Sequence, residues 1–224
     1  MNLEFFFNYM LQNKLEVIKE ALKAELPKSI VYALLITSFL SFSVFGFLIG
    51  SSHGVIQGFV SCFKLPLLFY ITCIICFPTL YIFLALLGIK TSLKGIAQFS
   101  VLALSIMSII LIAFAPVSLF FLVIKTDYEV FKLINVGMMA IAGLSGVYLF
   151  KKYILVNAPN ELSDISRTRI NRFVLLWLMM FGLIGTNLGF VISPIFGDPS
   201  VEFMWFTNAS QNFFSHILSI FQTN

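Results

Sequence analysis

The sequence predicts an all-α fold, an integral membrane helical bundle of about five transmembrane helices with amphipathic helices at the N- and C-terminal ends. Two observations predict it. Hydrophobic residues make up 59% of the chain and charged residues only 11%, whereas soluble domains carry about 25% charged residues. In addition, several long runs lack charge, and about 20 apolar residues suffice to cross the hydrocarbon core. Lipid must therefore be the solvent for much of this surface.

Residues 1–28 form the first predicted region, an amphipathic cytoplasmic or interfacial helix that Pro27 ends. We expect it to lie on the membrane surface or against the bundle, with a partner-binding helix as the alternative. A cleavable signal starts basic and then turns apolar, whereas this segment begins Met-Asn-Leu-Glu and becomes charged and amphipathic, so it does not resemble one. Its apolar residues recur at spacings of three and four: Phe7, Leu11, Leu15, Ile18, Leu22 and Leu26.

The first span is predicted at residues 29–50 and the second at 64–88. Gly46 and Gly50 are four residues apart, a spacing that lets another helix approach closely. The link 51–63 is expected to be a re-entrant or interfacial piece. Pro66 is placed in the first turn of the second span, where its missing N–H costs nothing, and Pro78 is expected to kink the middle of that span.

Cys73 and Cys76 form a C-x-x-C pair inside the second span. Such a pair is half of a redox or zinc motif, but no second pair of cysteines or histidines completes a site. On a helix the two thiols share a face, so we interpret them as small packing residues. No metal or cofactor is predicted.

The third and fourth spans are predicted at residues 100–124 and 131–148, after a polar link at 91–99. Pro116 is expected to kink the third span. The fourth carries Asn135 near its entrance and a face of small residues, comprising Gly137, Gly143, Ser145 and Gly146.

Residues 151–172 are the longest polar segment, interpreted as a solvated connector or a cytoplasmic docking site, with a helix start at Ser163 or Asp164. The fifth span, 173–192, contains Gly185, Thr186, Asn187 and Gly189. Asn187 is able to hydrogen-bond across helices, a contact worth on the order of 1 kcal/mol. The alternative is that these neutral polar residues line a pore or a lipid crevice.

The bundle is predicted to occupy residues 29–192 and an aromatic interfacial tail residues 193–224. A Pro/Gly cluster at 194–199 predicts a turn back along the surface, with a partner-contact loop as the alternative. Trp205 and the phenylalanines near it are typical of residues that anchor an interfacial helix.

Basic residues predict the orientation. If the N-terminus is inside, eleven of the 14 lysines and arginines are cytoplasmic, and an odd number of spans puts the C-terminus outside. The inside set is Lys14, Lys19, Lys23, Lys28, Lys90, Lys94, Lys151, Lys152, Arg167, Arg169 and Arg172, and the outside set is Lys64, Lys125 and Lys132. This bias explains the net charge of +4 without a nucleic-acid partner.

Catalytic and ion-coupling chemistry is not indicated. No predicted span has an ionisable residue near its middle, which argues against an ion-coupled pump or a voltage sensor. No H-E-x-x-H, G-x-S-x-G or phosphate-loop motif is present. His53 and His216 have no ligand partner at a useful spacing, so the protein is not expected to be an enzyme.

Several motifs resemble a known layout. Lys64-x-Pro66-Leu-Leu-Phe69, Phe77-Pro78-x-Leu80-Tyr81, Leu86-Leu87-Gly88 and Ala115-Pro116-Val117 are similar to a broad group of bacterial integral membrane proteins, as are Gly185-Thr-Asn-Leu-Gly189, Pro194-x-Phe-Gly197 and Phe203-x-Trp-Phe206. That group is similar in layout to the five-span Ypt-interacting (Yip) family. The resemblance implies an accessory or trafficking role without catalysis, in the bacterial inner membrane.

Two functions follow as expectations. The first is a non-enzymatic scaffold, anchor or assembly accessory that acts through another membrane or cytosolic protein. The second is an oligomeric pore or membrane-permeabilising effector made from copies of this chain. The candidate packing or pore-lining residues are Gly46, Gly50, Pro78, Pro116, Gly185, Thr186, Asn187 and Gly189.

Overall fold

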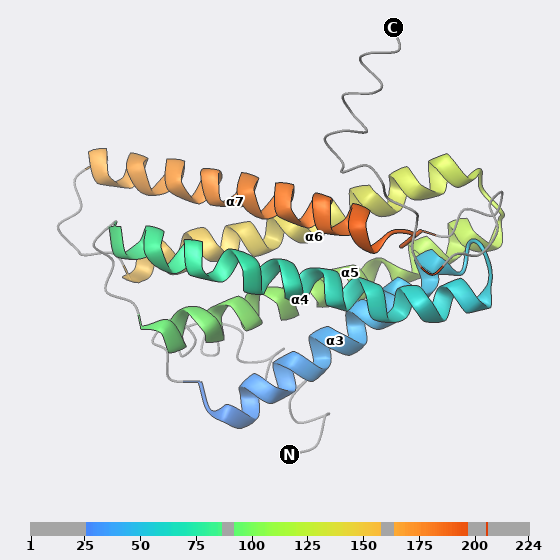
Figure 1. Ribbon diagram of the computed structural model, residues 1–224, viewed down its shortest axis with the longest axis horizontal. Coiled ribbons are helices and arrows are strands. Elements are labelled where there is room, and N and C mark those ends of the chain that lie inside the picture. Colours follow the sequence, from blue (N-terminus) through green and yellow to red (C-terminus); the bar gives the residue numbers. More distant parts are fainter. Residues whose placement is uncertain (1–25, 87–91, 158–163, 197–204, 206–224) are drawn as a thin grey trace, which may run out of the picture.

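The structure, a computed structural model, describes residues 26–86, 92–157, 164–196 and 205, and over these ranges it is all-helical (Figure 1). Its five helices are each long and apolar enough to cross a membrane. They are α3 (Lys28–Gly50), α4 (Val55–Leu86), α5 (Leu93–Val123), α6 (Tyr128–Asn157) and α7 (Asp164–Ile192). The predicted helical membrane bundle is confirmed.

The helices alternate in direction along one long axis. Figure 1 shows α3, α5 and α7 beginning at the end of the bundle where α4 and α6 finish. We call this the Lys28 end, and we call the opposite end, where α3 and α7 finish, the Gly50 end. With five helices, the start of α3 and the finish of α7 lie at opposite ends of the bundle.

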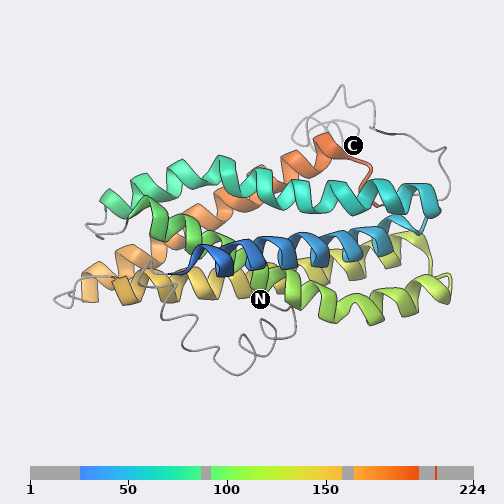
Figure 2. The same cartoon turned by 90° about the horizontal axis from the view of Figure 1, so that it is seen from below.

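Helix α3 is the centre of the arrangement. Its main contacts are with α4 and α5, while α6 packs on α5 and α7 packs on α4. The view from below shows α3 with α4 along one side and α5 along the other (Figure 2). Half of the most apolar window of α3 is buried, against 11% of the corresponding window of α7.

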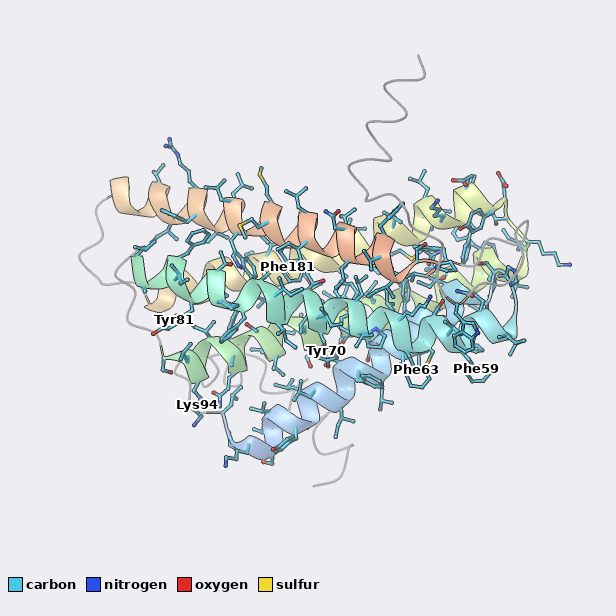
Figure 3. All side chains as sticks on the ribbon, in the orientation of Figure 1. Phe59, Phe63, Tyr70, Tyr81, Lys94 and Phe181 are labelled. Atoms are coloured by element: carbon cyan, nitrogen blue, oxygen red, sulfur yellow. The ribbon has the colours of Figure 1, made fainter. Side chains whose placement is uncertain are left out.

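Large apolar side chains cover the outside of the bundle. On α4, Phe59 and Phe63 are 59% and 63% exposed near the Gly50 end (Figure 3). Leu133 and Leu144 of α6 and Met179 of α7 are also exposed. Water would not tolerate so many exposed apolar groups, but the hydrocarbon of a bilayer does. Because the backbone polar groups of a helix are bonded within it, these surfaces fit a lipid environment.

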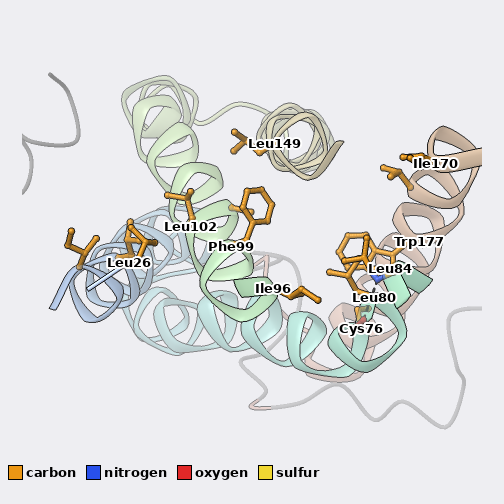
Figure 4. Close-up of a cluster of buried hydrophobic side chains, with 14 residues drawn as sticks. Leu26, Cys76, Leu80, Leu84, Ile96, Phe99, Leu102, Leu149, Ile170 and Trp177 are labelled. Atoms are coloured by element: carbon orange, nitrogen blue, oxygen red, sulfur yellow. Dashed lines mark hydrogen bonds between the residues drawn. The ribbon is translucent and has the colours of Figure 1, made fainter. Parts of the chain in front are cut away.

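The buried side chains form two clusters along the axis. The cluster nearer the Lys28 end draws on all five helices, and in it Trp177 of α7 lies beside Cys76, Leu80 and Leu84 of α4 (Figure 4). The cluster nearer the Gly50 end includes Phe42, Phe45 and Ile49 of α3, with Phe42 stacked on Phe69 at 4.4 Å between ring centroids.

The predicted boundaries of the second span are wrong. Helix α4 begins at Val55, so residues 55–63 are its first turns and not a re-entrant or interfacial link. Pro66 is therefore inside the helix and not in its first turn. The physical reason is that Lys64, the predicted start of the span, is buried and its ammonium donates to Pro194 O, so the helix continues through it.

The third span also begins earlier than predicted. Helix α5 starts at Leu93, where the Ser92 hydroxyl accepts a hydrogen bond from Gly95 N at 3.0 Å, so most of the predicted polar link is helical. Helix α6 extends beyond the predicted span at both ends. Helix α7 covers Asp164–Ile192, so its end agrees with the predicted end of the fifth span, while Ser163 lies outside the described residues. Both α4 and α5 stay helical through Pro66, Pro78 and Pro116.

The amphipathic helices predicted near the two termini lie outside the described residues. For the tail, the structure describes residues 193–196 and Trp205.

Candidate functional site

Gly46 and Gly50 lie where α4 approaches α3 most closely. A Cβ atom added to Gly46 would lie 2.5 Å from the backbone oxygen of Ser61, and one added to Gly50 would lie 2.6 Å from the Ser61 Cβ. From the other helix, a Cβ on Gly58 would lie 2.6 Å from the Ser51 Oγ. At Gly46 and Gly50 the close atoms include the backbone of α4, so a side chain there requires the backbone to move, and glycine fixes how near the two helices lie.

Three polar residues of α4 lie beside this contact. Gln57, Ser61 and Lys64 recur at spacings of four and three, so they share one helical face. All three are buried, with at most 6% of each residue exposed. We call them the α4 polar row. Lys64 lies nine residues into α4, about 13 Å along the axis from Val55, since each helical residue adds about 1.5 Å.

The α4 polar row binds the backbone that follows α7. The Gln57 amide nitrogen donates to Pro194 O at 2.9 Å, and the Ser61 hydroxyl donates to Ile195 O at 2.6 Å. The Lys64 ammonium donates to Pro194 O at 3.3 Å and to Trp205 O. Ile195 is itself buried in the cluster of the Gly50 end. The chain after Ile192 therefore turns back onto α4, where Ile195 is buried, and the rest of the Pro/Gly cluster predicted to turn along the surface lies outside the described residues.

Chemically, the α4 polar row is a set of donors directed at carbonyl oxygens. A buried ammonium is costly unless it is hydrogen-bonded, and carbonyl groups supply that compensation here. Sequence reasoning placed Lys64 at the water boundary and missed this role. The available signal was the spacing of Gln57, Ser61 and Lys64, which becomes visible only if α4 is extended back to Val55.

A second polar contact lies deeper in the bundle, where both neighbours of α3 donate to it. The Ser105 hydroxyl of α5 donates to Leu34 O at 2.6 Å, and the Tyr70 hydroxyl of α4 donates to Leu35 O at 3.0 Å. Ser38 shares this site through its contact with the Tyr70 hydroxyl. These hydroxyls hold α4 and α5 to adjacent carbonyl groups on α3. Sequence reasoning missed all three residues because isolated serines and tyrosines carry no spacing signal.

Asn135 joins α5 to α6. Its side-chain oxygen accepts from the Ser118 hydroxyl at 2.7 Å, and its amide nitrogen donates to Phe131 O at 2.8 Å. Asn135 and Ser118 are both fully buried. This polar residue of the fourth span therefore holds two helices together.

The candidates on α7 have looser surroundings. A Cβ added to Gly185 would lie 3.6 Å from the Thr72 Cγ2 of α4, an ordinary contact, and one added to Gly189 would lie 3.9 Å from Leu68. Within the described part of the chain, Thr186 and Asn187 donate to their own helix, at Gly182 O and Leu183 O respectively. The cross-helix bond expected of Asn187 is not among these contacts.

The eight candidate packing or pore-lining residues do not lie together on one surface of the bundle. Gly46 and Gly50 are buried between α3 and α4, whereas Pro78 and Pro116 are exposed on the outsides of α4 and α5. Cys76 is buried in the cluster of the Lys28 end, where its carbonyl oxygen accepts from the Trp177 indole at 3.3 Å. Over the ranges that the structure describes, no three His, Cys, Asp or Glu residues group as a metal site.

No protein-family model, curated protein or solved structure matches this chain. The fold therefore defines only the class of protein, which is a multi-pass helical membrane protein with five candidate membrane-spanning helices.

Proposed function

We propose that this protein is a non-enzymatic scaffold, anchor or assembly accessory for partner proteins in the membrane. The observation that supports it is the use made of polar side chains inside the bundle. Four of these side chains donate to backbone oxygens of another segment, namely Gln57, Lys64, Tyr70 and Ser105. Such contacts fix the helices relative to one another, which suits a protein that presents a rigid surface.

The proposal includes a place and an orientation. We propose the bacterial inner membrane, with the Lys28 end in the cytoplasm and the chain after α7 outside. Its support is the distribution of basic residues, because cytoplasmic loops carry an excess of Lys and Arg. A role similar to that of the Yip family, as an accessory to membrane traffic or assembly, would fit this layout.

A pore formed between copies of the chain is the second candidate. One observation favours it: Thr186 is an exposed polar residue on α7, the least buried of the described helices. A polar side chain on a lipid-facing surface is explained more simply if another copy covers it. Thr186 and the partly exposed Asn187 would then lie beside the pore axis.

One preparation tests both functions. The protein is purified in native lipid discs and the proteins bound to it are identified, with an unrelated five-span protein as the control. The same protein is then placed in liposomes that hold an ion-sensitive dye. A partner recovered in fixed ratio, together with tight liposomes, supports the scaffold. Ion flux that Thr186→Leu abolishes supports the pore and contradicts the scaffold.

A further inference from the structure

Exposed cations gather at the Lys28 end of the bundle. The side chains of Lys28, Lys94 and Arg172 are exposed and that of Lys152 is partly exposed. They come from four different helices, α3, α5, α7 and α6, and Lys94 is visible at this end in Figure 3. The cations are therefore spread around the rim of the bundle and not confined to one helix.

Two of these cations, Lys28 and Lys152, lie at nearly the same depth, as the contacts between helices show. Ser105 of α5 bonds to Leu34 of α3, and Met107 of α5 touches the Gly146 position of α6. Lys28 is six residues from Leu34 and Lys152 six residues from Gly146, both toward the Lys28 end. Each is thus about 9 Å beyond these contacts.

Arg172 of α7 lies nearer the tip of the Lys28 end. It lies five residues before Trp177, which bonds to Cys76 of α4, so it is about 8 Å beyond that contact. In the sequence, Lys28 and Arg172 directly precede the uncharged runs 29–50 and 173–192, and Lys152 lies two residues after the uncharged run 133–150. The cations consequently border the hydrocarbon, at the depth of lipid headgroups.

The Gly50 end differs in charge. Both acidic side chains that the structure describes, Asp127 and Glu129, lie there, and Glu129 pairs with Lys132 at 4.0 Å. This is the only ion pair within the described ranges. At the Lys28 end, α3 and α5 begin with no acidic residue in their first turns, whereas α7 begins with Asp164 and α4 and α6 finish there. A helix N-terminus carries partial positive charge and favours an anion.

We propose that the Lys28 end is a binding rim for anionic phospholipids. Phosphodiester headgroups would contact Lys28, Lys94, Lys152 and Arg172 while their acyl chains lie along the exposed apolar faces. A lipid suits this site better than a soluble anion, because the cations lie directly at the border of the apolar surface. A basic residue near an anionic membrane surface contributes about 1 kcal/mol, which is about five-fold in binding. The rim does not depend on the scaffold proposal, since a pore would carry it equally.

The test compares two double variants that each remove two cations. Lys28→Gln with Arg172→Gln neutralises the rim, and Lys125→Gln with Lys132→Gln is the matched control at the Gly50 end. Each protein is delipidated in mild detergent and offered equal parts of phosphatidylglycerol and phosphatidylcholine. Native mass spectrometry then gives the ratio of the two lipids retained. A second rim variant, Lys94→Gln with Lys152→Gln, guards against a folding defect in the first.

We expect the parent protein and the control to retain phosphatidylglycerol in preference, and each rim variant to lose at least about five-fold of that preference. Equal retention of both lipids by the parent would overturn the proposal, as would an equal loss in the control. Inorganic phosphate is added in a parallel sample. Displacement of the lipid by phosphate at millimolar concentration would show a site for a soluble anion and would also overturn it.

Discussion

Two glycine pairs with the same spacing have different roles in this bundle. Gly46 and Gly50 on the central helix α3 lie where an added Cβ would be within 2.6 Å of α4 atoms, whereas Gly185 and Gly189 on the outer helix α7 leave at least 3.6 Å. The polar residues follow the same division. Carbonyls of α3 accept hydroxyl groups from both neighbouring helices, but Thr186 and Asn187 of α7 bond to their own helix. The comparison teaches that the spacing alone does not locate the contact that holds the bundle together.

The largest effect is expected for Gly50→Val. Its Cβ would lie 2.6 Å from the Ser61 Oγ and 2.7 Å from Gln57 O, so α3 and α4 must separate. Overpacking of this kind costs about 1–3 kcal/mol and occasionally more. Denaturation in mild detergent measures the loss. Gly182→Val is the matched control, because nothing lies within 4 Å of that Cβ, and it should change stability by less than about 0.5 kcal/mol.

Lys64→Met tests the attachment of the chain after α7. Removing the ammonium deletes its bonds to Pro194 O, which keeps the Gln57 donor, and to Trp205 O, and a hydrogen bond from a charged group contributes about 1–3 kcal/mol. The free energy of unfolding should fall by that amount, and Lys64→Arg, which keeps the charge and the donors, should restore part of it. A Lys64→Met protein as stable as the parent would show that the α4 polar row does not hold this segment.

Ser105→Ala and Tyr70→Phe test the hydroxyl contacts on α3. Hydrogen bonds between membrane helices average about 0.6 kcal/mol, and each variant should lose about that much. Ser108→Ala is the control, because its hydroxyl bonds to Ser105 O of its own helix at 2.7 Å. The same denaturation experiment distinguishes them. If all three variants lost the same free energy of unfolding, hydrogen bonds between helices would stabilise the bundle no more than bonds within one helix.

The smallest effect is expected on α7. Thr186→Val and Asn187→Leu each remove a bond within the helix, so the free energy of unfolding should stay within about 0.5 kcal/mol of the parent value. The measurement is again unfolding in detergent. A loss as large as that of Gly50→Val would mean that α7 packs against another chain or segment through these residues, and would break the comparison.

The sequence predicted what depends on local composition. Uncharged length identified the spans, and the predicted end of the fifth span agrees with the end of α7 at Ile192. The spacing of Gly46 and Gly50 indicated a close approach, although it did not say which helix approaches. These features depend on residues that are neighbours in the sequence, so predicting them requires no knowledge of how the helices pack.

What the sequence could not predict depends on burial. Residues 55–63 are interpreted from the sequence as a link because Lys64 is the predicted start of the span, yet they are helical and Lys64 is buried. Likewise, Gly185 and Gly46 have equivalent local patterns, and only the three-dimensional arrangement gives one a close neighbour and the other an ordinary contact. The partners of Lys64, 130 residues or more away in the chain, carry no local signal at all.

The central claim, that cohesion is concentrated where α3 meets α4, is tested most directly by one matched pair. Gly46→Ala and Gly185→Ala make the same chemical change at the first glycine of each pair. The free energy of unfolding in detergent should fall by about 1–3 kcal/mol for Gly46→Ala, whose Cβ would lie 2.5 Å from Ser61 O, and change little for Gly185→Ala. Equal losses in the two variants, or a larger loss for Gly185→Ala, would contradict the claim.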